Sequence, residues 1–192
     1  MLGGSFNPAH AGHLHVARIA RRRLRLHQVW LMVSPGNPLK PAHGMAAPAA
    51  RLASARRIAD GRRIIATDIE GRLGTSYTID TICTLVQRFP GARFVWLMGA
   101  DNLVQLPRWR SWRAIAAQVA FAVLPRPTYN HRALASHAAH RLAAHRLPVH
   151  AAATLPALSA PRWVFLPTAQ NATSATVIRA TSATAIRLNR SS

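Results

Sequence analysis

The chain has 192 residues, 49% of them hydrophobic, which is enough for one domain with a sizeable core. Lysine and arginine total 25 against five acidic residues, giving a formal charge of +20. Such a charge attracts polyanions. Nearly every basic residue is arginine, however, and a GC-rich genome would produce the same excess of arginine without any dedicated partner. No apolar run is long enough to span a membrane, and the single cysteine, Cys83, excludes an internal disulfide framework, so we expect a cytoplasmic protein with no membrane partner.

Short apolar runs alternate with helical patterns along the chain. Only Met1 and Leu2 precede Gly3, so the first strand is expected to be shortened to almost nothing. Further strands are predicted at 29–34, 62–67, 93–99, 119–124 and 162–166, and helices at about 13–27, 48–60, 78–89, 111–117 and 131–146. The strands are continuous apolar runs, as parallel strands covered on both faces are. The pattern predicts an α/β fold, a Rossmann-like doubly wound parallel sheet with helices on both faces, in a single domain over 1–192.

The first motif that indicates chemistry is GGSFNPAHAGH, residues 3–13. Its two glycines allow a ligand to approach the backbone closely, and Asn7-Pro8 indicates a turn. The residues that follow have a helical pattern, so His10 and His13 are expected in the loop and the first helical turn. Free N–H groups and the positive end of the helix dipole favour phosphate there. Taken alone, the motif is also compatible with a glycine turn that carries two surface histidines.

A second motif, TSATVIRA, occupies residues 173–180, within a helix expected at about 168–192. Ser174 and Thr176 are good N-cap residues, and Arg179 would lie one turn further on, so the segment predicts a second phosphate cradle or an ordinary capped helix. The sequence repeats the pattern as SATAIR at 182–187. Counting from the last predicted strand, we expect the first copy to be the functional one.

Two further features draw attention. Lys40 is the only lysine, and it lies among turn residues in PGNPLKP. The low-complexity stretch 128–161 contains His137 and His140 at a spacing of three, but no nearby cysteine or carboxylate would complete a metal site. We therefore predict no metal ligand from the protein, and we expect a Pro/Ala-rich connection after the helix of this stretch.

The two phosphate motifs carry a resemblance. G-G-S-F-N-P-x-H-x-G-H followed late in the chain by S-x-T-x-I-R resembles the nucleotidyltransferase superfamily with the H-x-G-H signature. Within it, SPGNPLKP, GTSYTIDTICTL and MGADNLVQLPRWRSWRAI resemble conserved segments of the bacterial nicotinate mononucleotide adenylyltransferases, in the order in which that family carries them. The matches run from residue 3 to 179, nearly the whole chain.

The resemblance implies a reaction in which the phosphate of nicotinate mononucleotide attacks the α-phosphorus of ATP. The products would be deamido-NAD and pyrophosphate, a step in NAD biosynthesis, without a covalent enzyme intermediate. Such transfers need alignment and charge neutralisation more than acid–base chemistry. Mg²⁺ is expected as a cofactor carried with ATP, because five carboxylates make a dedicated protein cage implausible.

The resemblance also implies residue roles. The residues expected in catalysis are His10, His13, Lys40 and Arg179. Those expected to bind ATP are Gly3, Gly4, Ser5, Phe6, His13, Gly99, Asp101, Ser174, Thr176 and Arg179. Those expected to bind nicotinate mononucleotide are Asn37, Lys40, Ser76, Tyr77, Thr78 and Trp109, the last by stacking on the pyridine ring, while Trp112 is assigned to the core.

Several of these residues also have purely structural interpretations. Tyr77 could cap the end of a strand, and Asp101 could be the N-cap of a helix that starts after Gly99. Trp109 and Trp112, three apart, could form one apolar helix face. Their joint occurrence in one order favours the functional interpretation of the set.

Three rival functions remain at this stage. Another H-x-G-H enzyme, such as a pantetheine-phosphate adenylyltransferase or a cytidylyltransferase, shares the phosphate motifs, but the S-Y-T-x-D-T and tryptophan segments argue against it. A basic nucleic-acid-binding protein is supported by the +20 charge alone, and because no recognition module is evident we predict no dedicated nucleic acid partner. An inactive, truncated relative is suggested by the short first strand and by the ending LNRSS, because members of the resembling family usually continue past the S-x-T-x-I-R helix.

Overall fold

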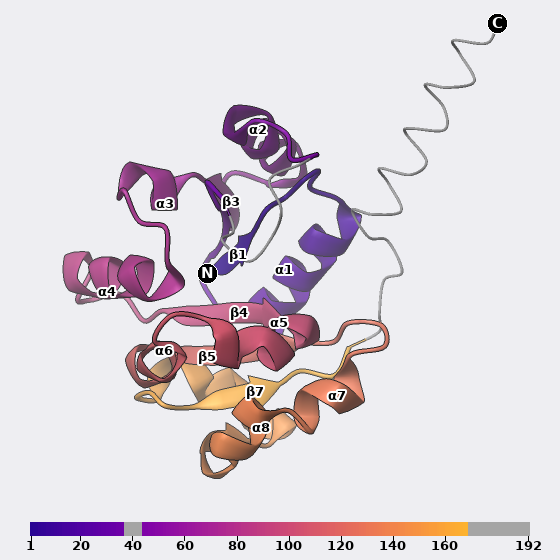
Figure 1. The fold of residues 1–192 in the computed structure, drawn as a ribbon, viewed down its shortest axis with the longest axis vertical. Coiled ribbons are helices and arrows are strands. Elements are labelled where there is room, and N and C mark those ends of the chain that lie inside the picture. The colour runs from indigo at the N-terminus through magenta and orange to yellow at the C-terminus, as the bar shows by residue number, and fades with distance from the viewer. Residues whose placement is uncertain (37–43, 169–192) are drawn as a thin grey trace, which may run out of the picture.

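The computed structural model describes residues 1–36 and 44–168. Within them, seven strands form one sheet in the order β3-β2-β1-β4-β5-β7-β6, and every strand pair is parallel (Figure 1). The order reverses direction between β1 and β4, which makes this the topological switch point of a doubly wound sheet. The predicted fold class is confirmed.

The elements alternate along the chain as the sequence predicts. The strands are β1 (Leu2–Gly4), β2 (Val29–Val33), β3 (Ile64–Thr67), β4 (Val95–Gly99), β5 (Ala120–Leu124), β6 (Arg146–Leu147) and β7 (Trp163–Phe165). The α-helices are α1 (Ala11–Arg23), α2 (Pro48–Ile58), α3 (Ile69–Arg72), α4 (Thr78–Arg88), α5 (Ala100–Gln105), α6 (Trp112–Gln118), α7 (Asn130–Leu134) and α8 (His137–Arg141). Short 3₁₀ helices are η1 (Leu106–Arg108), η2 (Ala143–His145) and η3 (Val149–Ala157).

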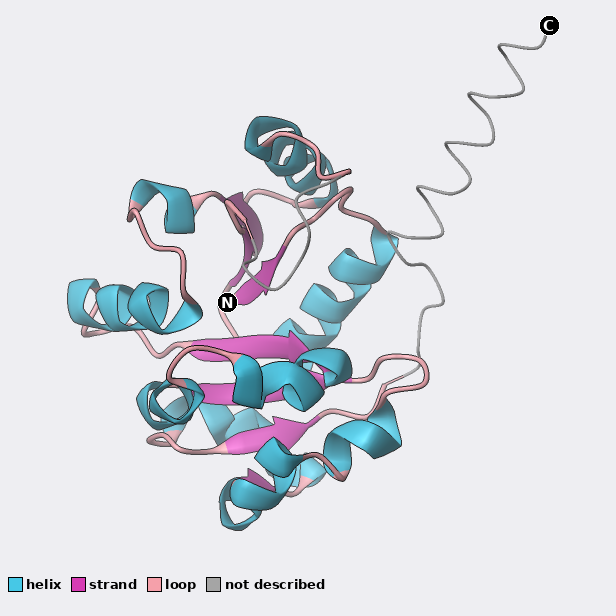
Figure 2. Cartoon of the chain, in the orientation of Figure 1, coloured by secondary structure: helices cyan, strands magenta, loops and turns pink. Residues whose placement is uncertain are grey.

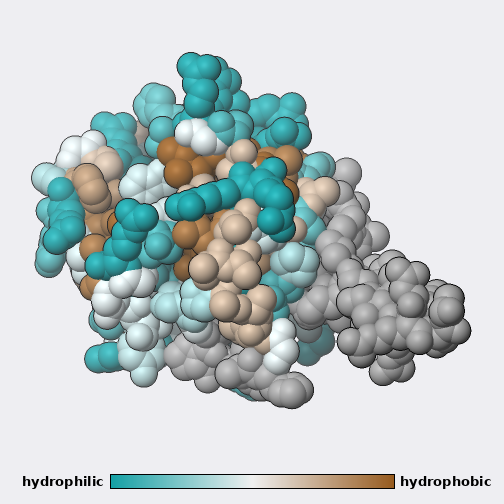
Figure 3. Space-filling view, turned by 90° about the horizontal axis from the view of Figure 1, so that it is seen from above, coloured by the Kyte–Doolittle hydropathy of each residue, from teal (hydrophilic) through white to brown (hydrophobic). Residues whose placement is uncertain are grey.

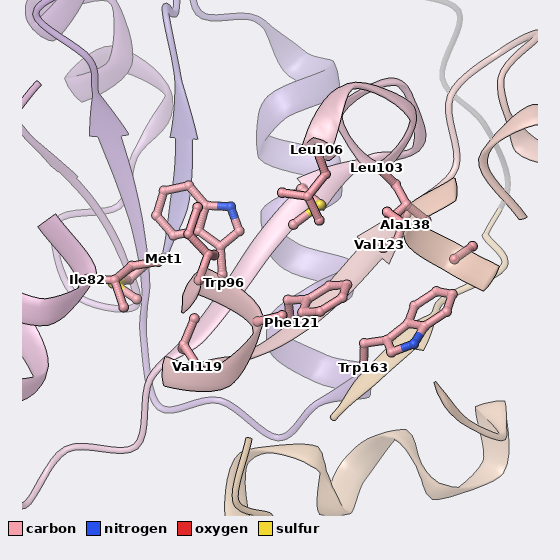
Figure 4. Close-up of a cluster of buried hydrophobic side chains, with 14 of the residues drawn as sticks. Met1, Ile82, Trp96, Leu103, Leu106, Val119, Phe121, Val123, Ala138 and Trp163 are labelled. Atoms are coloured by element: carbon pink, nitrogen blue, oxygen red, sulfur yellow. The ribbon is translucent and has the colours of Figure 1, made fainter. Parts of the chain in front are cut away.

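Helices cover the sheet on both sides (Figure 2), and the strands contribute side chains alternately to two cores. In β4, Val95 and Leu97 face the core under α1, α2 and η3, whereas Trp96 and Met98 face the core under α4 to α8. Figure 4 shows this second core, in which Phe121 and Trp163 stack with ring centroids 5.7 Å apart. Burial on both faces explains why these strands are continuous apolar runs.

The central strand is short, as expected, but it is paired on both sides. β1 has three residues, with Leu2 opposite Leu31 of β2 and Leu97 of β4. The ladder extends one residue further back, because Leu97 donates to the carbonyl of Met1 at 2.7 Å. The lack of a side chain at Gly3 is required here, since a Cβ would lie 2.9 Å from the Trp96 ring.

The first helix ends earlier than the predicted 13–27. Arg25 has a φ of +52°, Arg25 N donates to the Arg22 carbonyl, and Leu26 N donates to the Arg21 carbonyl at 2.9 Å. These two bonds form a Schellman motif, which usually has glycine in the left-handed position. An arginine occupies that position here, so the sequence carries no stop signal.

The prediction of a single helix at 131–146 is wrong. The segment breaks into α7, α8 and η2, and Arg146–Leu147 then pairs with β7 as an edge strand. Ser136 starts α8 as an N-cap that accepts from Ala139 N, and the indole of Trp163 donates to the Leu142 carbonyl at 2.8 Å. The periodicity of alanine and histidine predicts one continuous helix, whereas the Ser136 cap and the Trp163 hydrogen bond accompany its division into shorter elements.

Two elements had little or no sequence signal. α3 was not predicted, and the expected Pro/Ala-rich connection contains the 3₁₀ helix η3, Val149–Ala157. α5 was anticipated only as an alternative, the helix for which Asp101 could be the N-cap. The helix expected at about 168–192 falls outside the described residues, apart from Thr168.

One face of the molecule shows how polar and apolar side chains are distributed on the surface (Figure 3). Figure 3 shows one face on which hydrophilic side chains dominate and apolar ones reach the surface near the centre. None of the helices in the described part of the chain combines the length and hydropathy needed to cross a lipid bilayer. The described residues also contain no group of three histidine, cysteine or acidic side chains that could hold a metal ion, so His137 and His140 form no such site there.

Candidate functional site

The predicted site residues that the structure describes gather at the carboxyl ends of the central strands. Gly4 ends β1 and leads into the histidine loop, while Gly99 ends β4 and leads directly into α5. Ligands of open α/β sheets bind at this edge, beside the switch point. Residues that are far apart in sequence therefore meet at one edge of the sheet.

The histidine loop ends in the first turn of α1. His10 is the N-cap, and its Nδ1 accepts a hydrogen bond from Gly12 N at 3.2 Å. His13 reaches back, so that its Nδ1 accepts from His10 N at 3.2 Å, and the two rings lie 3.8 Å apart between centroids. This reciprocal arrangement is a capping box built from two histidines. A ring nitrogen that accepts a hydrogen bond carries no proton, so the neutral rings hold their protons on Nε2.

Both imidazoles are held in the neutral form. Burial lowers the pKa of His13 to about 3, with smaller contributions from His10 and from the positive charge of Arg126. Burial and Arg126 also lower the pKa of His10. Near neutral pH the histidines can therefore act as Nε2–H donors rather than as cations. The positive charge beside them belongs to Arg126, whose role the sequence did not suggest.

Asp101 and Arg126 form the side of the site next to β4 and β5. The Nε atom of Arg126 lies 3.6 Å from Oδ1 of Asp101, an ion-pair distance rather than a hydrogen bond. This Oδ1 is buried and accepts no hydrogen bond. A Cβ at Gly99 would collide with the Asp101 carboxylate and lie 3.0 Å from Arg126 Nε, so a larger residue would displace both side chains. The site thus contains a buried acceptor that awaits a donor.

A pocket of about 160 Å³ adjoins the glycine loop. It is bounded by the ends of β1 and β2, the start of α4 and the segment around η1. The lining residues are Gly3, Gly4, Ser5, Ser34, Gly36, Glu70, Ser76, Tyr77, Thr78, Arg108, Trp109, Arg110 and Ile115. Hydroxyls, an indole and two guanidinium groups give the pocket the chemistry to hold an aromatic anion.

The purely structural interpretations offered for Tyr77, Trp109 and Asp101 do not match their positions in the structure. Tyr77 precedes α4 as its N-cap residue, rather than ending a strand, and the guanidinium of Arg110 lies 4.7 Å from the centre of its ring. Trp109 lies in extended backbone before α6, so it does not share a helix face with Trp112. Both indoles pack against the core under α4 to α8, and Trp109 also lines the pocket. Asp101 is likewise not an N-cap, because Gly99 holds that position for α5.

Glu70 is the unexpected member of the pocket. Its side chain is buried, and among the described residues it forms no ion pair. Burial raises the pKa of Glu70 to about 7, while the hydroxyl of Ser34 acts in the opposite direction. A carboxyl group that is half protonated at neutral pH therefore lines a pocket otherwise suited to an anion.

The structure brings together part of the predicted set. Gly3, Gly4, Ser5, Ser76, Tyr77, Thr78 and Trp109 line one pocket, and His10, His13, Gly99 and Asp101 lie around Arg126. Phe6 is buried and packs against His13, with ring centroids 4.8 Å apart. Asn37, Lys40, Ser174, Thr176 and Arg179 lie outside the described residues.

Sequence reasoning missed five charged residues of the site region: Arg51, Glu70, Arg108, Arg110 and Arg126. In a chain with 24 arginines and one lysine, no local pattern separates a site arginine from a surface one. The only available signal was the scarcity of acidic residues, since Glu70 is one of five.

The fold is that of a doubly wound α/β protein, and the N-terminus of α1 at its switch point has the geometry that suits a phosphate group. A family model described as cytidylyltransferase-like matches residues 1–181. The chain is 58% identical to a protein of Gluconacetobacter diazotrophicus over 94% of this chain and 84% of that one. It is 59% identical to one of Gluconobacter oxydans, over 93% and 92% of the two chains. Both are named "Probable nicotinate-nucleotide adenylyltransferase".

Solved structures give the same fold. The nicotinic acid mononucleotide adenylyltransferase of Plasmodium falciparum complexed with NaAD has a TM-score of 0.68 at 17% identity, covering 93% of this chain and 80% of that one. The same enzyme complexed with APC gives a TM-score of 0.65 at 16% identity. The chain therefore belongs to the cytidylyltransferase-like family, in the branch of the nicotinate-nucleotide adenylyltransferases.

Proposed function

We propose that the protein transfers the adenylyl group of ATP to nicotinate mononucleotide and releases pyrophosphate, the deamido-NAD-forming step of NAD biosynthesis. The observation that carries this proposal is the juxtaposition of a histidine-capped helix N-terminus with an aromatic, hydroxyl-lined pocket at one switch point. The first suits the phosphates of one nucleotide and the second suits the ring of another. The names of the curated relatives and the ligands of the solved structures support the same substrates.

The reaction is a direct displacement. A phosphate oxygen of the mononucleotide attacks the α-phosphorus of ATP, the bond from that phosphorus to the α–β bridging oxygen breaks, and the electron pair leaves with pyrophosphate. Negative charge grows on the α-phosphoryl oxygens and on the leaving group as this happens. The protein has to align the two nucleotides and stabilise that charge.

The described residues supply both. The Nε2–H groups of His10 and His13 would donate to phosphoryl oxygens, because the Nδ1 atom of each neutral ring already accepts a backbone hydrogen bond. Arg126 would add the positive charge beside them. The buried Oδ1 of Asp101 would accept from a ribose hydroxyl, which would satisfy an acceptor that has no hydrogen bond in the protein.

The second substrate would occupy the pocket. Trp109 would stack on the pyridinium ring, whose positive charge favours the aromatic face. Ser76, Tyr77 and Thr78 would border the nicotinate carboxylate at the start of α4, where free N–H groups are available. From the family resemblance, Asn37 and Lys40 would contact its phosphate, and Ser174, Thr176 and Arg179 would hold the phosphates that leave.

Mg²⁺ would enter with ATP. The described residues offer no cluster of acidic, histidine or cysteine side chains for a resident ion, and Mg²⁺ prefers phosphate oxygens and water to an all-protein cage. MgATP is therefore treated as the substrate, and no protein ligand is assigned to the metal.

The test is pyrophosphate release from MgATP with nicotinate mononucleotide, nicotinamide mononucleotide or phosphopantetheine as acceptor. We expect release with nicotinate mononucleotide, reduced about 10²–10³-fold in His13→Ala because one donor to the transition state is lost. His27→Ala is the matched control, since His27 is exposed at the opposite end of the sheet. Release only with another acceptor would replace the proposed substrate, and no release from folded protein would refute the activity.

A further inference from the structure

Helix α2 turns an arginine inward. Its three arginines are Arg51, Arg56 and Arg57, of which the last two are exposed, whereas Arg51 is only 2% exposed. Ser54, three residues on, is also buried, so the two polar side chains lie on the same inner face of the helix. A fully buried charged side chain is rare unless its hydrogen bonds are made.

With the described residues Arg51 forms four hydrogen bonds, all to backbone carbonyls. Its Nε donates to Ala46 at 2.9 Å, and its Nη2 donates to Pro35 at 3.1 Å. Its Nη1 donates to both Ser5 and Ser34, at 2.9 and 2.6 Å. The described carboxylates form no ion pair with it. One guanidinium therefore joins the segments that follow β1 and β2 to the segment that precedes α2.

The same region fixes the histidine loop at two more points. Ser54 Oγ accepts from Ala9 N at 2.9 Å. The side chain of Asn7 donates to the Gly44 carbonyl at 3.0 Å and accepts from Ala46 N at 3.1 Å. The loop from Ser5 to Ala9, directly before the N-cap histidine, is thus tied to α2 and its approach.

The attached loop contains a residue in an unfavourable backbone conformation. Phe6 has a φ of +47°, a left-handed conformation that a bulky residue adopts only where its surroundings enforce it. The carbonyls that Arg51 holds on either side belong to Ser5 and Ser34, which both line the pocket. Arg51 therefore holds the backbone of two residues that line the pocket, one of which belongs to the histidine loop.

We propose that Arg51 is a positioning residue for the transfer: by holding the carbonyls after β1 and β2, it sets the distance and orientation of the histidine pair relative to the pocket. The proposal rests on the proposed function, in which the histidines bind one substrate and the pocket binds the other. Arg51 touches neither substrate. Its effect is on alignment, which is expressed in the rate of the bound complex rather than in the binding of each substrate.

The kinetic test compares Arg51→Lys and Arg51→Gln with Arg56→Gln, an exposed arginine of the same helix. At a temperature where circular dichroism shows every variant folded, we expect kcat to fall about 10²-fold in Arg51→Gln and less in Arg51→Lys, which keeps a donor. The KM values for both substrates should stay within about threefold, and Arg56→Gln should match the wild type. A folded Arg51→Gln variant with wild-type kcat would overturn the proposal.

A second measurement does not depend on turnover. Amide hydrogen exchange reports Ala9 and Gly12, whose N–H groups bond to Ser54 and His10. In Arg51→Lys we expect both amides to exchange about tenfold faster, with the β5 amides unchanged. Unchanged exchange at Ala9 and Gly12 would also overturn the proposal.

Kinetics and hydrogen exchange together distinguish failure of the proposed function from failure of the positioning role of Arg51. Absence of pyrophosphate release by the wild type would refute the function, while exchange would still decide whether Arg51 holds the loop. If Arg51→Gln does not fold, Ser54→Ala replaces it, since it removes one loop attachment without leaving a buried charge. Its kcat should fall while its KM values hold, and an unchanged kcat would count against positioning from α2.

Discussion

Replacement of Glu70 by glutamine should change how the stability of the protein depends on pH. Burial raises the pKa of Glu70 from 4.5 to about 7. Between these values the folded protein binds more protons than the unfolded chain, so the wild type loses stability as pH rises. The penalty is absent below pH 4.5, grows up to about pH 7, and reaches at most about 3 kcal/mol above it. Glutamine resembles the protonated carboxyl and does not ionise, so Glu70→Gln should avoid the penalty.

Urea denaturation followed by tryptophan fluorescence measures this difference at pH values from about 4 to about 8. Wild type and Glu70→Gln should be equally stable at the acid end, and the variant should be more stable at the alkaline end. Asp60→Asn is the control, because three backbone N–H groups lower the pKa of Asp60 to about 2, outside this range. A stability difference between wild type and Glu70→Gln that does not change with pH would refute the reasoning.

The same carboxyl group should affect substrate binding. Ionised Glu70 would repel an anionic mononucleotide in the pocket, against the attraction of Arg108 and Arg110, which line it too. The KM for nicotinate mononucleotide should therefore rise above about pH 7 in the wild type more than in Glu70→Gln. The ratio of the two KM values is the readout, because the substrate phosphate itself titrates near pH 6. A ratio independent of pH would mean that the carboxyl group does not reach the bound substrate.

Three further changes have defined outcomes. Gly3→Ala should lower the free energy of unfolding by about 1–3 kcal/mol, because a Cβ would lie 2.9 Å from the buried ring of Trp96, whereas Gly71→Ala, which faces open space, should not; equal melting curves would contradict this. Trp109→Ala should raise the KM for the mononucleotide roughly tenfold with little effect on the KM for ATP, and an equal rise in both would argue against stacking. Arg126→Gln should raise the pKa of both site histidines, a shift that ¹⁵N or ¹H NMR titration detects and that unchanged titration curves would exclude.

The local pattern of the sequence determined the architecture. Continuous apolar runs such as 119–124 are strands because both faces of a parallel sheet are covered, and this shows in each run by itself. The position of His10 at the start of α1 also follows from neighbouring residues, since a turn signal and a helical pattern meet there. Family segments in a fixed order then indicated the chemistry before any contact was known.

Only the tertiary structure showed which polar side chains are buried, how their pKa values shift and which distant residues they contact. Arg51 and Arg56 look alike in the sequence, and only the carbonyls after β1 and β2 show that one of them is buried. The raised pKa of Glu70 and the lowered pKa of His13 arise from burial by segments far along the chain. The helix predicted at 131–146 was broken partly by a hydrogen bond from Trp163, which no local pattern contains. Periodicity records which face of an element is apolar, whereas burial, charge and hydrogen-bond partners are set by residues that meet only in the folded chain.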